Sequence, residues 1–214
     1  LAKDRADGYA TVQQGLIARS GEGFLHLAHD GKSWMAEEGF GNFPVVNVPW
    51  KGADAYCRWA DDGGGSLPSE AQWEHAARGA DARVYPWGAD RPNGERSVFK
   101  RSGYAGIQNV GRAAKGASPC GALDMAGNVE EWCFDWYDDT AYTRGGKDPL
   151  VKDKPSTSDR RVVRGGSFET DAATDIKPSD SDAPSDLRTF FRGRRAPASV
   201  SEFRGFRCAA RSAQ

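Results

Sequence analysis

The segment GALDMAGNVEEW, residues 121–132, contains the carboxylates of this sequence whose spacing best suits chemistry. Asp124 and Glu131 stand on either side of the dipeptide Gly127–Asn128, which is typical of a tight turn. Carboxylates before and after such a turn can converge on one ion, and calcium takes about six to eight oxygen ligands, backbone carbonyls included. The same residues also suit an Asx-type turn with solvated carboxylates, and the residue types alone favour that interpretation.

The cysteines are the second group that could do chemistry. They are Cys57, Cys120, Cys133 and Cys208, and none stands in a C-x-x-C pair. Because the chain has only 3 histidines, these groups do not predict a zinc site. Two disulfides in an exported protein and buried free thiols both agree with the spacing, so the pattern leaves both open.

The sequence contains no standard motif of nucleophilic catalysis. G-x-S-x-G, a P-loop and H-E-x-x-H are all absent. The segment RGGSF places Ser167 after two glycines, but no histidine lies near it in the sequence to activate its hydroxyl.

The composition excludes several classes of protein. The 214 residues carry 29 Lys and Arg against 30 Asp and Glu, a formal net charge of −1, which argues against a general nucleic-acid binder and a polybasic membrane anchor. No apolar run approaches the roughly 18 residues of a membrane-spanning helix. The length predicts one domain over residues 1–214. Since the sequence starts at Leu1 without a signal peptide, we expect a processed, trimmed or partial chain.

Two short helices are predicted before residue 80. In the first, apolar residues recur at helical spacing over 53–60, and the glycines at 63–65 end it. The second begins at Ser69, whose spacing to Gln72 is that of a capping box, and it ends at Gly79.

The rest of the chain predicts short strands and irregular loops. FPVVNVPW, residues 43–50, reads as a short buried strand bounded by prolines. After Gly79 the helical period disappears, and turn signals alternate with brief aromatic or β-branched pieces. Residues 171–186 are rich in Asp, and the stretch that begins at Arg188 is rich in Arg, which favours internal ion pairs over a ligand-binding patch.

Six segments, taken in order, resemble the formylglycine-generating enzyme, or sulfatase-modifying factor, domain family. They fall within residues 43–211 and read FPVVNVPWKGADAYCRWA, LPSEAQWEHAARG, YPWG, GALDMAGNVEEWCFDWY, RVVRGGSF and GFRCAAR. The family's opening strands either diverge within residues 1–42 or are missing from this chain. The resemblance implies a single compact α+β domain of the C-type-lectin-like kind, with two short helices, short strands and much irregular loop.

The resemblance also implies a disulfide, a metal site and a compartment. The family pairs the cysteines that match Cys57 and Cys208. Its calcium ligands match Asp124, Gly127, Val129 and Glu131 here. In the family, the positions of Gly127 and Val129 bind the ion through their backbone carbonyls. With these matches, a structural calcium ion replaces the solvated turn as the preferred interpretation of the loop. Many family members are exported, so we expect a periplasmic or secreted protein of a bacterium.

One departure from the family pattern concerns copper. The sulfatase-activating members carry two cysteines just after the GGS motif, whereas Thr170 and Asp175 stand roughly at those positions here. A hydroxyl and a carboxylate cannot replace the soft thiolates that copper(I) requires. We therefore expect neither copper nor formylglycine generation. The remaining pocket is predicted to have Trp132, Ser167 and Phe168 at its floor, beneath the polar loop that follows.

The sequence thus predicts a calcium-braced accessory member that binds a small ligand or a protein partner, with no nucleic acid and no membrane span involved. Two alternatives on the same fold stay open: an oxidative tailoring enzyme of the siderophore-maturation branch, and a lectin-fold variable ligand-binding protein. The latter is disfavoured because its diversified tail tends to be rich in Asn and Tyr, and residues 185–214 contain neither.

Overall fold

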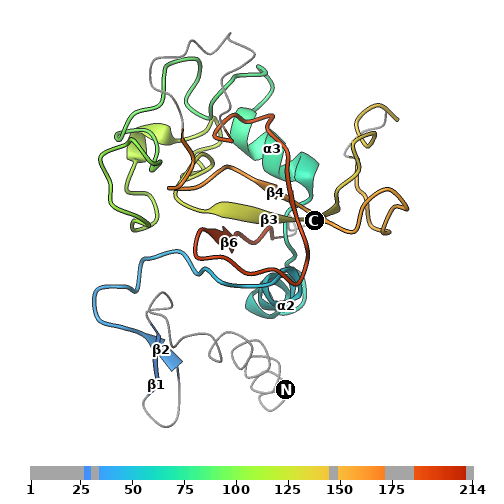
Figure 1. The fold of residues 1–214 in the computed structure, drawn as a ribbon, viewed down its shortest axis with the longest axis horizontal. Helices are drawn as coiled ribbons and strands as arrows, with labels where there is room; N and C mark the ends of the chain where they lie inside the picture. Colours follow the sequence, from blue (N-terminus) through green and yellow to red (C-terminus); the bar gives the residue numbers. More distant parts are fainter. Residues whose placement is uncertain (1–26, 30–33, 145–148, 172–185, 211–214) are drawn as a thin grey trace.

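The computed structural model describes residues 27–29, 34–144, 149–171 and 186–210. This part consists of α-helices and two small sheets joined by long irregular loops (Figure 1). The elements in chain order are β1 (Leu27–His29), β2 (Trp34–Ala36), α2 (Trp50–Ala60), α3 (Glu70–Arg78), the 3₁₀-helix η2 (Ala114–Gly116), β3 (Glu130–Trp136), β4 (Arg161–Arg164), β5 (Gly193–Arg195) and β6 (Arg204–Phe206). The predicted α+β class with short strands is confirmed.

Local signals in the sequence set the ends of α3. The Ser69 hydroxyl accepts a hydrogen bond from the Gln72 backbone N–H (3.1 Å), and the Gln72 side chain accepts one from the Ser69 N–H (2.9 Å). This is the predicted capping box. The helix ends at Gly79, whose φ of 61° lies in the left-handed region.

The other helix, α2, buries one face against the sheet. Its buried residues include Trp50, Ala53 and Cys57, which repeat every three or four positions. The helix ends before a glycine run, and Gly63 has a φ of 91°. Both predicted helices are therefore present.

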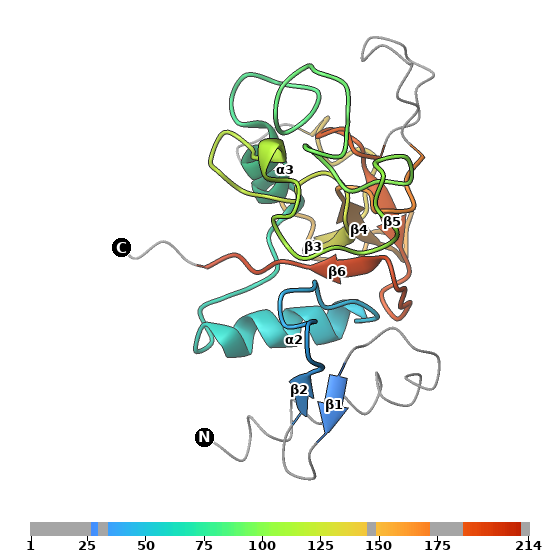
Figure 2. The ribbon, with the colours of Figure 1, turned by 90° about the vertical axis from the view of Figure 1, so that its left-hand side faces the viewer.

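The larger sheet has the strand order β5-β4-β3-β6, with β3 antiparallel to β4 and parallel to β6. Successive side chains of a strand point to opposite faces, so β3 and β4 supply both faces of the core. Trp132 and Val163 pack with α2 residues, while Cys133 and Val162 pack with α3 residues. The two helices consequently cover opposite faces of the sheet (Figure 2).

The strand predicted at residues 43–50 is wrong. Val46 and Val48 are buried, but this segment forms no ladder and runs directly into α2. Asn47 has a φ of 59°, which interrupts an extended conformation, and the flanking prolines have no N–H to donate. The segment instead makes single hydrogen bonds, such as the one from Asn47 N to the Ser201 carbonyl (3.0 Å).

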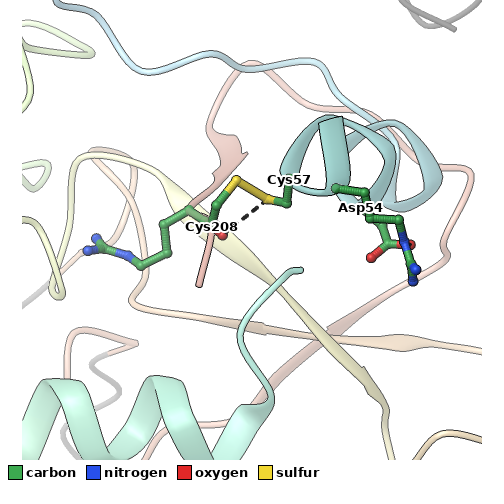
Figure 3. Close-up of a disulfide and its surroundings, with 5 residues drawn as sticks. Asp54, Cys57 and Cys208 are labelled. Atoms are coloured by element: carbon green, nitrogen blue, oxygen red, sulfur yellow. Dashed lines mark hydrogen bonds and ion pairs between the residues drawn. A yellow bond between two sulfur atoms is a disulfide. The ribbon is translucent and has the colours of Figure 1, made fainter. Parts of the chain in front are cut away.

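Cys57 and Cys208 form a disulfide with a Cα–Cα distance of 5.2 Å (Figure 3). It joins α2 to the segment after β6 and is the pairing that the family resemblance implies. Cys120 and Cys133 are free thiols. Within the described ranges, no helix combines the length and the apolar character needed to cross a bilayer.

Candidate functional site

The turn that follows β4 is closed by its own side chains. Thr170 N donates to the Ser167 carbonyl (3.0 Å), and Ser167 N donates to Thr170 Oγ1 (2.9 Å). The Ser167 hydroxyl accepts a hydrogen bond from Glu169 N (3.2 Å). Both hydroxyls thus serve the backbone, and in the described part of the chain neither bonds a histidine or a carboxylate that could activate it.

This turn is fastened to the loop that contains the predicted calcium ligands. Gly127 N donates to the Gly165 carbonyl (2.8 Å), and Phe168 N donates to the Asn128 carbonyl (2.9 Å). Two segments that are far apart in the sequence, the predicted pocket and the predicted metal loop, therefore form one continuous region.

The candidates predicted for the pocket, which include Thr170 and Asp175 besides the three floor residues, lie in more than one place. Ser167, Phe168 and Thr170 lie together in the turn, where Ser167 is buried and the other two are partly buried. Trp132 is 0% exposed and packs in the core between the sheet and α2. Asp175 lies outside the described residues.

Asp186 approaches the same turn from the segment before β5. Gly166 has a φ of +66°, and a Cβ there would lie 2.8 Å from Thr170 Oγ1 and 3.0 Å from Asp186 Cβ, so this close approach requires glycine. Burial raises the pKa of Asp186, the charge of Glu130 adds to the rise, and Arg195 opposes it. A partly buried carboxylate therefore stands beside the turn.

Glu130 is a buried carboxylate that two arginines share. Arg195 donates to it through Nε (3.2 Å) and Nη2 (2.9 Å), and Arg204 donates through Nε. The Arg204 guanidinium also lies 4.7 Å from the centre of the Trp132 ring. Sequence reasoning missed this group because the parallel register of β3 and β6, which pairs Glu130 with Arg204, has no local signal.

Glycine sets the conformation of the predicted calcium loop. Gly127 has a φ of +85°, and a Cβ there would lie 2.3 Å from the Val98 carbonyl oxygen and 2.5 Å from Ser97 Oγ. The next residue, Asn128, donates its backbone N–H to the Val98 carbonyl at 2.8 Å. Residues 97–98 therefore pack so closely against position 127 that only glycine fits there.

Asp124 and Glu131 interact electrostatically at this loop. Burial raises the pKa of Asp124, and the charge of Glu131 adds to the rise, although the Gly111 N–H, which donates to Asp124 at 2.7 Å, opposes it. Both oxygens of Glu131 accept hydrogen bonds from Arg207, and one also accepts from the Trp73 indole.

Asp124 has the chemistry of a calcium ligand, whereas both oxygens of Glu131 already accept hydrogen bonds from Arg207. Arg207 offsets one of the two negative charges, that of Glu131. Among the described residues Asp124 has no ion pair, so it is a partly buried hard-oxygen donor whose charge a cation would offset. The backbone carbonyls of Gly127 and Val129 belong to the same loop and would complete the ligand set.

The two free thiols lie away from the turn. Cys133 is fully buried in the core beside α3, and burial raises its pKa well above the ordinary value, which keeps it a thiol. Cys120 is exposed, with its sulfur 3.3 Å from the Ala76 carbonyl oxygen. A hydrogen bond with Ser118 lowers the pKa of Cys120.

Comparison with known proteins establishes the family. The sequence profile of the family described as "Sulfatase-modifying factor enzyme 1-like domain" matches residues 11–212. The chain belongs to this family. The match begins at residue 11, so it includes part of residues 1–42, in which no motif of the family's opening strands could be recognised.

Individual relatives are similar to large parts of this chain. A "Serine/threonine-protein kinase pkn1" from Chlamydia pneumoniae is 35% identical over 175 residues, which cover 82% of this chain and 25% of the kinase. A "Formylglycine-generating enzyme" from Thermomonospora curvata is 34% identical over 203 residues (86% and 63%). An "Inactive C-alpha-formylglycine-generating enzyme 2" from Bos taurus is 34% identical over 177 residues (78% and 50%). The chain thus spans between a quarter and under two thirds of these relatives.

Solved structures share the fold of this sulfatase-modifying factor domain. Treponema denticola variable protein 1 has a TM-score of 0.62 at 23% identity, covering 86% of this chain and 77% of its own. PvdO from Pseudomonas aeruginosa has a TM-score of 0.59 at 21% identity, covering 90% and 74%. The fold implied by the family resemblance is confirmed.

Proposed function

We propose that this domain is a binding member of its family and not a formylglycine-generating oxidase. The Ser167–Thr170 turn carries the proposal, because its hydroxyls are bonded to the backbone where the oxidases begin their thiol pair. Copper(I) needs soft thiolate ligands, and the free thiols of this chain are Cys120 at the surface and Cys133 in the core. The 34% identity to a relative named as inactive agrees with this role.

We further propose that calcium braces the binding region through Asp124, Gly127, Val129 and Glu131. The support is the partly buried charge of Asp124, which lacks an ion pair among the described residues, and the hydrogen bonds that join this loop to the turn at Gly165 and Phe168. Ordering the loop would therefore order the turn, so the ion has a structural role and takes no part in a reaction.

In this proposal the domain binds a protein or a small ligand. It does so in the periplasm of a bacterium or after secretion. The disulfide between Cys57 and Cys208 supports that compartment, since such bonds persist in oxidising surroundings.

The oxidase assay tests the central claim. The purified domain is incubated with copper, oxygen and a sulfatase peptide that contains the target cysteine, and the peptide mass is followed, with the Thermomonospora curvata enzyme as the positive control. We expect no conversion, and detectable formylglycine would refute the binding-only role. Elemental analysis separates the alternative oxidative tailoring enzyme, which predicts stoichiometric copper or iron, from the calcium-braced domain.

A further inference from the structure

A row of alternating arginine and tyrosine side chains crosses the surface beside β5. The Arg–Tyr row consists of Arg194, Tyr137, Arg192 and Tyr142. The guanidinium carbons of Arg194 and Arg192 each lie 4.8 Å from the centre of the Tyr137 ring, and that of Arg192 lies 5.0 Å from the Tyr142 ring. The two arginines are alternate residues at β5, so they project to the same side of the sheet.

The Arg–Tyr row ends in a pocket at the C-terminal end of α3. The pocket has a volume of about 390 Å³ and is lined by residues of α3 and the segment after it, among them Glu74 and Arg78, and by Tyr142. This volume lies within the range of small-ligand pockets, and it suffices for one side chain of a bound peptide. Tyr142 belongs to both the pocket and the row, so the two form one continuous surface.

Charged side chains pair beneath this surface. Arg192 binds Glu70 through two hydrogen bonds of 2.7 Å. Glu74 is shared between Arg78, at 2.7 Å, and the fully buried Arg164. Glu74 and Arg78 line the pocket, and the buried Arg164 gives Glu74 a second cation.

A positive charge stands at the other end of the row. Arg194 is exposed, and in the described part of the chain it makes no ion pair. The rings of Tyr137 and Tyr142 lie between the two charged ends. Together these features place two tyrosine rings between cationic side chains.

We infer that this surface binds an acidic peptide segment of a partner protein, with one carboxylate in the pocket against Arg78 and a second at Arg194. Arginine forks match carboxylates geometrically, and tyrosine rings give contact area at a low cost in conformational entropy. The inference rests on the proposed binding role and specifies its partner. The residues of the row and the pocket are distinct from the Ser167–Thr170 turn.

Fluorescence anisotropy with a short labelled peptide of alternating Glu and Gly tests this inference. We expect binding at low salt that weakens at high salt, and no binding of the matched peptide with Gln in place of Glu. Arg194→Gln and Arg78→Gln should each weaken binding about three- to fivefold. Arg58→Gln is the control, because it removes an exposed charge from α2 on the opposite face of the sheet.

Arg194 is exposed, so we expect its replacement to leave the fold intact. If Arg78→Gln fails to fold, binding by Arg194→Gln and the salt dependence of binding still test the inference. Equal binding of the Gln peptide, equal weakening by Arg58→Gln, or equally tight binding of an oligonucleotide of the same charge would each overturn the inference. The oxidase assay reports on the binding-only role independently, so the two failures are distinguishable.

Discussion

Arg207 donates hydrogen bonds of 2.6 Å to both carboxylate oxygens of Glu131 and thereby fastens the segment after β6 to the central strand β3. The Glu131 side chain is 6% exposed, and that of Arg207 is 29% exposed. Trp73 donates a further hydrogen bond to the same carboxylate at 2.7 Å. One arginine thus neutralises a buried charge that belongs to the predicted calcium loop.

Replacing this arginine should be costly. Arg207→Met leaves the Glu131 carboxylate buried without its counter-charge, and we expect the free energy of unfolding to fall by about 2–3 kcal/mol. Urea unfolding measures the change. The matched control, Arg58→Met, breaks the exposed pair with Asp54 and should cost under about 1 kcal/mol. Equal losses in the two variants would contradict a special role for the Glu131 pair.

The contribution of the Asp124 charge to stability should change sign when calcium is added. Burial raises its folded-state pKa above the unfolded value, so without calcium the free energy of unfolding falls as the pH rises between those two values, and the penalty is fully present above the folded-state pKa. Asp124→Asn removes the charge and keeps an oxygen for the Gly111 N–H. We therefore expect this variant to melt higher than wild type in a chelator and lower than wild type in calcium.

Differential scanning fluorimetry with and without calcium makes that comparison. Asp81→Asn is the contrasting control, because the Arg83 hydrogen bond lowers the pKa of the exposed Asp81 to about 2. Its melting temperature should fall slightly and by the same amount in both conditions. If Asp124→Asn melted higher than wild type in calcium as well as in the chelator, the proposed metal site would be refuted.

The disulfide should contribute a large share of the stability. Cys57 and Cys208 are separated by 151 residues, and the loop-entropy relation gives about 4–5 kcal/mol for closing a loop of that length. The double replacement by Ala, followed in urea, should show a loss of this order. Cys120→Ser is the control, since that thiol is free and exposed. A double variant as stable as wild type would show that native strain cancels the entropic gain.

Gly127 should tolerate no side chain. Gly127→Ala combines a left-handed φ of +85° with a Cβ only 2.3 Å from a backbone oxygen, and we expect it to cost about 3–4 kcal/mol. Gly121 has a nearly equal φ of +82° but nothing within 4 Å, so Gly121→Ala should cost about 1 kcal/mol. Thermal or urea unfolding of both variants separates the contact from the backbone strain. Similar losses would mean that the Val98 segment simply moves aside.

The helices could be predicted because their signals are local. A capping box at Ser69 and a glycine at position 79 are chemical features of nearby residues, and the structure uses both. The prediction of a strand at residues 43–50 is wrong because the deciding information is not local. Its apolar run reports burial correctly, but one residue with positive φ, Asn47, removes the ladder, and that choice depends on contacts with residues near Ser201.

The charged groups of the site could not be predicted from spacing. The Arg-rich end of the chain does make internal ion pairs, but Arg192, Arg204 and Arg207 bind glutamates of α3 and β3. Those pairings follow from strand order and register, which depend on the whole fold. The i,i+4 spacing of Glu74 and Arg78 on α3 is a local signal that could have indicated one ion pair at the pocket.

The parallel pairing of β3 with β6 has a consequence for how the protein is made. Glu130 and Arg204 are 74 residues apart, and Arg204 lies near the end of the matched family domain. A ribosome must therefore release almost the entire domain before its central strand gains its second neighbour. Until then one edge of β3 keeps unpaired backbone N–H and C=O groups, which stay accessible to chaperones, proteases and other nascent chains. Truncations that stop before residue 204 should accordingly be degraded or aggregate and should not yield a smaller folded unit.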